Sequence, residues 1–153
     1  TLLSPHHLSF PILTKRPTMF YVRHGDDQMT MFNSKCQLVV LANHIKKALN
    51  IPRTATLDFF PCTTDPKMMV PMGLADKGDV TYAHTFLPVR STFALMTVKE
   101  DEEGVKEYSL LWNSSTSLGD MRDKLAAAVD VRNSDEKKKS GGKGGKGPAA
   151  SKK

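Results

Sequence analysis

The amino-acid sequence predicts an α+β fold in which a β-hairpin is followed by one helix and then by further strands. Residues 19–22 and 29–32 have strand composition and flank a Gly-Asp-Asp turn. Residues 38–49 carry apolar side chains at helical spacing. Residues 91–99, "STFALMTVK", form the strongest strand segment in the chain.

The predicted hairpin turn covers His24 to Gln28, in the stretch "RHGDDQ". Gly25, Asp26 and Asp27 are turn residues, because glycine tolerates positive φ and short acidic side chains hydrogen-bond to nearby backbone. His24 is placed to hydrogen-bond across the hairpin. We therefore expect an exposed loop here at which a partner binds, through Arg23, His24, Asp26 and Asp27.

The first helix has start and stop signals as well as an apolar stripe. Ser34 is followed three residues later by Gln37, the spacing of a capping box. Asn50 and Pro52 are predicted to end the helix.

The second half of the chain alternates strands with turn-rich segments. A third strand is predicted over residues 55–60, a short apolar segment over 67–70, and a possible partner strand over 105–112 after an acidic turn. A second helix follows. Its predicted N-cap is Ser117, its first turn contains Asp120, and its apolar side consists of Leu118, Met121, Leu125 and Val129.

Alternation along the strands divides their side chains between the two faces of the sheet. The core-facing set is Phe20, Val22, Leu57, Phe59, Phe93 and Leu95, packed against Leu38, Leu41, Ile45 and Leu49. The other set, on the open face, is Tyr21, Ala94, Met96 and Val98. An exposed apolar patch of this kind is typical of a docking surface, unless the C-terminal helix folds back and turns it into a second core layer.

Composition divides the 153 residues into four parts. Residues 1–17 are predicted as an N-terminal arm, 18–112 as the folded domain, 113–133 as the C-terminal helix and 134–153 as a disordered basic tail. The whole chain has a formal net charge of +6, and the tail carries seven lysines, so the rest is close to neutral. The tail is expected to bind polyanions or only to solubilise the chain, through Lys137, Lys138, Lys139, Lys143, Lys146, Lys152 and Lys153.

No metal site, cofactor or membrane span is predicted. Cys36 and Cys62 are too few for a disulfide framework and lack C-x-x-C spacing, so we expect free thiols in a reducing compartment. Asp26 and Asp27 have no further oxygen ligands at turn spacing. No apolar run approaches the length that spans a bilayer.

The triplet Arg23-His24-Gly25 resembles the phosphate-accepting motif of histidine phosphatases. Phosphoryl transfer needs several positive groups around the phosphate. The available candidates are Arg53 and His84, with Glu100 or Glu103 as the acid, and none stands in the surroundings which that family shows. We therefore expect no enzymatic activity, and a histidine phosphatase-like enzyme remains an alternative.

The order of elements, together with "MFYV" and "KMMVPMGLADKGDVTYAHTFLPVRSTFALMTVK", resembles the ubiquitin-like β-grasp. "MFYVRHGDDQ" and "LANHIKKALNIP" resemble an uncharacterised animal family that is named after a human X-chromosome open reading frame. "FYVRHGD" is also similar to the start of doublecortin domains, although His24 stands where that pattern has Asn.

The resemblances and the basic tail together imply a protein-interaction module. We expect a structural component of a microtubule assembly, such as the axoneme of a cilium or flagellum, located in the cytoplasm. Its partners would be proteins, tubulin or other axonemal proteins among them, and not nucleic acid, a membrane or a small-molecule substrate. A signalling adaptor of the Ras-binding β-grasp type is a further alternative.

Overall fold

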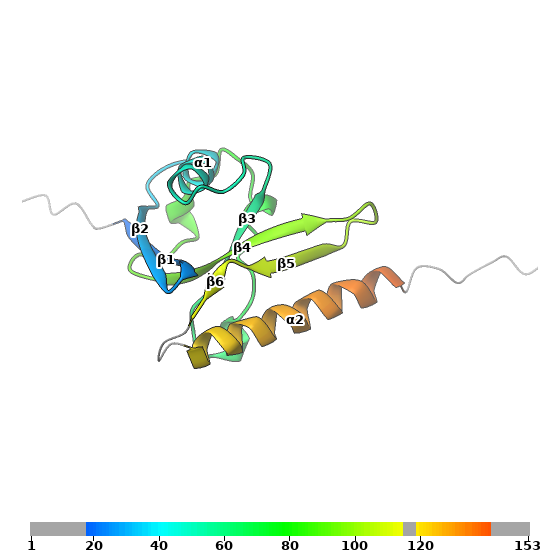
Figure 1. The fold of residues 1–153 in the computed structure, drawn as a ribbon. Coiled ribbons are helices and arrows are strands. Elements are labelled where there is room, and N and C mark those ends of the chain that lie inside the picture. The colour runs from blue at the N-terminus through cyan, green and yellow to red at the C-terminus, as the bar shows by residue number, and fades with distance from the viewer. Residues whose placement is uncertain (1–17, 115–118, 142–153) are drawn as a thin grey trace, which may run out of the picture.

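The computed structural model describes residues 18–114 and 119–141. Within them a mixed six-stranded sheet lies between helix α1, Leu38–Ala48, and helix α2, Gly119–Gly141. Figure 1 shows α1 above the sheet and α2 below it. The predicted α+β class with a C-terminal helix is therefore confirmed. The predicted arm at residues 1–17 and the end of the predicted tail, 142–153, lie outside the described residues.

Four strands form the main path of the sheet, in the order β2-β1-β4-β3. β1, Met19–Asp26, and β2, Gln28–Asn33, pair as the predicted antiparallel hairpin. β4, Thr92–Glu100, lies parallel to β1 on one side and antiparallel to β3, Thr56–Pro61, on the other. The longest strand, β4, is thus central.

Two further strands continue the sheet beyond β4. β5, Lys106–Leu110, pairs with the second half of β4, and β6, Trp112–Asn113, pairs in parallel with the end of β1. The single strand predicted over 105–112 is therefore divided at Leu111, whose backbone N–H donates to the Leu95 carbonyl at 2.8 Å. The chain therefore pairs with β4 before Leu111 and with β1 after it.

Helix α1 begins and ends through backbone geometry. The capping box predicted from Ser34 is wrong, because the helix starts after Gln37 and the Ser34 hydroxyl donates instead to the Thr18 carbonyl at 2.8 Å. The predicted end is confirmed: Asn50 follows the C-cap with φ of 56°. The Ile51 N–H then donates to the Lys46 carbonyl at 2.8 Å, which turns the chain away from the helix.

The core on the α1 side is the one that alternation predicts. All six core-facing strand residues are buried in one cluster with Leu38, Leu41 and Ile45, and Leu49 packs against its edge. Three of the phenylalanine rings lie within 6 Å of one another, centroid to centroid: Phe20, Phe59 and Phe93. Such pairs add to the hydrophobic stabilisation of the core.

The short apolar segment at 67–70, which stands where the β-grasp resemblance implies a short strand, does not form one. The segment contains a 3-10 turn, Pro66–Met68, and two similar turns follow at Leu74–Asp76 and Ala83–Thr85. Asp58 of β3 anchors this region, because its buried carboxylate accepts hydrogen bonds from the backbone N–H groups of Phe59, Gly73 and Leu74. Burial raises the pKa of Asp58, and the three donors oppose that shift.

The second core layer lies between the sheet and α2. Leu125 and Val129 of the helix pack on sheet residues that are equally buried: Phe60, Ala94, Met96, Tyr108 and Trp112. The prediction that the helix ends at residue 133 and disorder begins at residue 134 is wrong, because α2 continues to Gly141. Ion pairs along the helix, Arg132 to Glu136 at 3.2 Å and Lys139 to Glu136 at 3.4 Å, favour this continuation. Ser117 and Leu118 lie outside the described residues.

Candidate functional site

The first predicted site, at the hairpin, is partly buried. His24 is 9% exposed, and its Nε2 atom lies 2.8 Å from the Thr30 hydroxyl oxygen, which confirms the predicted hydrogen bond across the hairpin. Burial lowers the pKa of His24. The prediction that the strand breaks at His24 is wrong, because β6 pairs with Gly25 and Asp26 and extends β1.

The other hairpin residues differ in their surroundings. The Arg23 guanidinium lies over the Trp112 ring, 5.4 Å from its centroid, and the side chain is half-buried. Asp27 makes the turn with φ of 54° and is also half-buried. Of the four predicted contact residues Asp26 is exposed, Arg23 and Asp27 are half-buried, and His24 alone is buried. The binding of a partner at this loop stays a prediction.

The second predicted site, the open sheet face, is covered in part. Ala94 and Met96 are 0% exposed beneath α2, whereas Tyr21 and Val98 are half-buried. At Ala94 and Met96 the C-terminal helix forms a second core layer, which is the alternative that the sequence left open. Binding of a partner through Tyr21 and Val98 stays a prediction.

The third predicted site is the basic tail, of which only the beginning is described. Lys137, Lys138 and Lys139 are exposed on the last turns of α2. The Lys137 ammonium lies 3.8 Å from a carboxylate oxygen of Glu107 on β5. Outside the described residues are Lys143, Lys146, Lys152 and Lys153.

The arrangement around His24 contains little catalytic machinery. His84 lies in an exposed 3-10 turn, where its ring contacts Tyr82, and Arg53 lines a different groove from His24. In residues 18–114 and 119–141, no three His, Cys, Asp or Glu side chains are grouped so that they could hold a metal ion. Neither α1 nor α2 is long and apolar enough to cross a membrane, and no other described helix is.

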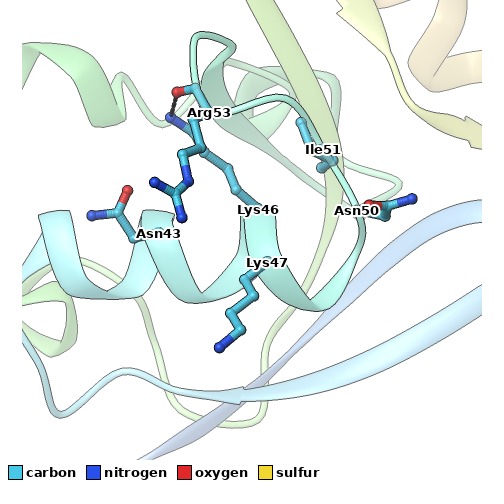
Figure 2. A pocket seen from close by; sticks show the side chains of 6 residues that line it. All are labelled: Asn43, Lys46, Lys47, Asn50, Ile51 and Arg53. Atoms are coloured by element: carbon cyan, nitrogen blue, oxygen red, sulfur yellow. Dashed lines mark hydrogen bonds between the residues drawn. The ribbon is translucent and has the colours of Figure 1, made fainter.

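A basic groove that was not predicted lies where α1 ends. Figure 2 shows its six lining residues, which surround a cavity of about 560 Å³. Three come from the last turns of α1 and three from the loop that leads to β3: Asn43, Lys46, Lys47, Asn50, Ile51 and Arg53. The groove thus has three cationic side chains and two amides, and none of its lining residues is acidic.

The helix end and the loop are held together by the groove residues themselves. The Lys46 ammonium donates a hydrogen bond to the Arg53 carbonyl at 3.0 Å. Figure 2 shows the Arg53 side chain turning back over α1 toward Asn43, while Lys47 extends away from the loop. The Ala55 N–H donates to the Pro52 carbonyl at 3.0 Å and closes the turn into β3. The loop therefore has a defined shape.

Among the described residues the groove cations have no acid at ion-pair distance, and Asp79 lines an adjoining cavity that shares Asn43 and Lys46 with the groove. No ion pair within 4.0 Å joins Lys46, Lys47 or Arg53 to an acid among the described residues. Cations at the C-terminal end of a helix interact favourably with its dipole, which offsets part of their mutual repulsion. An anionic ligand would offset the rest.

One signal in the sequence could have indicated this groove. Between Asp27 and Asp58 there is no acidic residue, whereas the same stretch contains Lys35, Lys46, Lys47 and Arg53. Two of these cations fall in the last turn of the predicted helix and one falls just beyond it.

The fold and the groove define a small α+β domain with an unpaired cationic surface at the end of its first helix. The chain belongs to the family described as "Il2rg: Putative Interleukin 2 receptor, gamma chain", whose model matches residues 24–115, more than half of the 153 residues. No solved structure matches the chain.

The family match corrects several expectations. The resemblance to the family named after an X-chromosome open reading frame, and that to doublecortin domains, is wrong, because the matched model is that of a cytokine-receptor chain. The predicted structural role in microtubules, cilia or flagella is wrong for the same reason. The match gives no support to the Ras-binding adaptor or the phosphatase alternative. The cytoplasmic location stays a prediction.

Proposed function

We propose that this chain is a non-enzymatic protein-interaction domain that binds an acidic segment of a partner protein in the basic groove at the end of α1. One observation carries the proposal: Lys46, Lys47 and Arg53 line one groove that has no acidic lining residue. Exposed cations usually alternate with acids or pair with them on a protein surface. A cluster without such pairing favours a negatively charged ligand.

The chemistry of the lining residues suits carboxylates. An arginine guanidinium can bind a carboxylate through two parallel hydrogen bonds, and a lysine adds a point charge. The amides of Asn43 and Asn50 can donate to backbone carbonyls of the same ligand. Both kinds of group are therefore available for a peptide that has acidic side chains.

A protein ligand fits better than a nucleic acid. Single-stranded nucleic acids are usually bound by cationic grooves in which bases stack on aromatic rings, and no aromatic residue lines this groove. The description of the matched family names a receptor chain, and receptor chains bind other proteins. Both points support a protein partner.

The surroundings of His24 support a non-enzymatic role. Its Nε2 atom is engaged by the Thr30 hydroxyl, and its pKa is lowered by burial with no charged partner among the causes. Catalytic bases are usually positioned by a second polar or charged group and reach the substrate directly. Neither feature supports catalysis at this position.

We also propose that the fold is a ubiquitin-like β-grasp. The hairpin of β1 and β2, helix α1 on one face of the sheet and the parallel pairing of β1 with β4 support this assignment.

The test is a titration with a fluorescein-labelled peptide of six glutamates, followed by fluorescence anisotropy. The variant Lys47→Glu/Arg53→Glu reverses two groove charges and keeps Lys46, which holds the loop. We expect its affinity for the peptide to fall at least about tenfold, since each lost charge-assisted contact weakens binding by roughly that factor.

The matched control is Lys35→Glu/Lys124→Glu, which makes the same change in net charge. Lys35 and Lys124 are exposed and line none of the groove. We expect this control to bind nearly as tightly as the unmodified chain. Equal weakening in both double variants would mean that only the net charge matters, and the proposed site would be rejected.

A further inference from the structure

We infer that the ligand of the basic groove also carries an apolar side chain, which occupies a second cavity beside that groove. This inference rests on the proposed function and names the ligand more closely: a peptide segment in which acidic residues flank one large apolar residue.

The second cavity adjoins the basic groove. It has a volume of about 460 Å³ and shares Asn50 and Ile51 with the groove as lining residues. A third cavity, of about 360 Å³, reaches toward His24 and Gln28 and is lined by the same two residues. Three cavities therefore meet around the loop that follows α1.

The second cavity is apolar where the first is charged. One wall is the loop after α1, with Ile51, Pro52 and Ala55, and the sheet side contributes Val98 and Leu111. Figure 1 shows that β4 and β5 continue well beyond the end of α1, so the helix does not cover this part of the sheet. Half-buried Ile51, Val98 and Leu111 thus leave apolar surface open to a ligand.

The charges of the residues that line the cavities indicate which ligand residues flank the apolar side chain. None of the residues that line the three cavities is Asp or Glu. Lys99 stands at the second cavity, separate from the cations of the basic groove. A ligand that places its apolar side chain in the second cavity would have cations on both sides, which favours acidic residues before and after that side chain.

Apolar anchors of this kind supply much of the affinity of small interfaces. An aliphatic side chain that leaves water for a fitted pocket strengthens binding about tenfold or more. The acidic residues would contribute attraction and orientation, and the apolar residue would distinguish one acidic segment from another.

The inference is tested with two fluorescein-labelled peptides, Glu-Asp-Glu-Leu-Glu-Asp-Glu and the same sequence with Ser in place of Leu. We expect the unmodified chain to bind the Leu peptide about tenfold more tightly. The variant Thr56→Trp fills the second cavity from an exposed strand position, where an aromatic residue is well tolerated. It should remove the advantage of the Leu peptide and leave the affinity for the Ser peptide nearly unchanged.

The outcomes separate the inference from the proposed function. Equal affinities of the unmodified chain for both peptides overturn the inference, whereas the proposed function stands because both are bound. Binding of neither peptide overturns the proposed function itself. The variant Ile51→Ala provides a second test from the opposite wall, and it should weaken the Leu peptide more than the Ser peptide.

A second copy of the chain is the competing occupant, because the turn between β4 and β5 presents exposed Glu100, Asp101, Glu102 and Glu103. Sedimentation velocity over a range of chain concentrations distinguishes it. Self-association that Thr56→Trp abolishes would assign the cavity to another copy and overturn the inference. A monomer at all concentrations supports a separate partner.

Discussion

At the residue scale, His24 stands in a sequence motif that resembles a catalytic one, but its side chain has a structural role. The triplet Arg23-His24-Gly25 matches a phosphatase motif, but Thr30 on the paired strand engages the ring and Trp112 lies under the arginine. The hydrogen bond could be predicted, because it joins two strands of one local hairpin. The surroundings of the ring could not, since the cavity beside it is also lined by Leu49, Leu95 and Leu111, which are distant in the sequence.

The lowered pKa of His24 predicts a dependence of stability on pH. The unfolded chain takes up the proton near pH 6.5, whereas the folded chain does so only at lower pH. Stability from the neutral ring is therefore complete above about pH 6.5 and is lost as the pH falls toward the folded pKa. We expect His24→Gln to show a smaller drop in melting temperature than the unmodified chain between pH 7.5 and 5.5.

Glutamine is a suitable replacement because it can keep a hydrogen bond to Thr30 and does not titrate. The measurement is thermal unfolding by circular dichroism at the two pH values. An identical drop in both proteins would show that protonation of His24 does not contribute. The comparison within each protein removes any constant loss caused by the substitution.

At the element scale, α2 is a long helix that is held at few points. Leu125 and Val129 are its buried residues, and both lie in its first half. Further along, Asn133 forms two hydrogen bonds with β5: its Oδ1 accepts from the Tyr108 N–H at 2.8 Å, and its Nδ2 donates to the Tyr108 carbonyl at 3.0 Å. The side-chain amide thus pairs with the edge of the sheet as a neighbouring strand would.

This arrangement predicts that Asn133 fixes the second half of α2. Asn133→Ala leaves the Tyr108 N–H and carbonyl without these partners, and we expect a loss of about 1–3 kcal/mol in the free energy of unfolding. Hydrogen exchange of the Tyr108 amide should become faster. The control is Asp135→Ala, an exposed position on the same turn, for which we expect less than about 0.5 kcal/mol.

A different result would change the account of this helix. If Asn133→Ala leaves both the stability and the exchange of the Tyr108 amide unchanged, the other contacts of α2 hold it on the sheet. These are the packing around Leu125 and Val129, the hydrogen bond from Arg122 to the Trp112 carbonyl and the Lys137–Glu107 pair.

The elements differ in how far the sequence determined them. Strands β1 to β4 and helix α1 follow from local periodicity, and the core set from alternation is confirmed. The 3-10 turn at Leu74–Asp76 could not be predicted, because its start is held by Asp58, which accepts from the backbone N–H groups of Gly73 and Leu74 fifteen and sixteen residues away. The end of α2 was missed because its last turns are polar and resemble a disordered tail in composition.

At the scale of the whole molecule, the family match covers α1 and most of the sheet but not helix α2. The match over residues 24–115 takes in most of the sheet and all of α1, and with them every residue of the basic groove. It ends before α2, so the covering of the second sheet face lies outside the match. The groove therefore lies within the matched part of the chain.

The groove itself could be predicted only in part. The absence of acids between Asp27 and Asp58 is visible in the sequence. The position of Arg53 beside the end of α1 is not, because it depends on the left-handed turn at Asn50 and on the hydrogen bond from Lys46 to the Arg53 carbonyl. Linear spacing does not give the direction in which a loop returns.

The central claim is that an acidic peptide binds at the end of α1, and a nuclear magnetic resonance titration of the ¹⁵N-labelled chain tests it most directly. The probe is the peptide Glu-Asp-Glu-Leu-Glu-Asp-Glu at low ionic strength, where charge interactions are least screened. We predict saturable shifts in the backbone amides of residues 43–56, with little change along α2. Shifts that cluster instead on Lys137 to Lys139, or no saturable shifts at all, would contradict the proposed site.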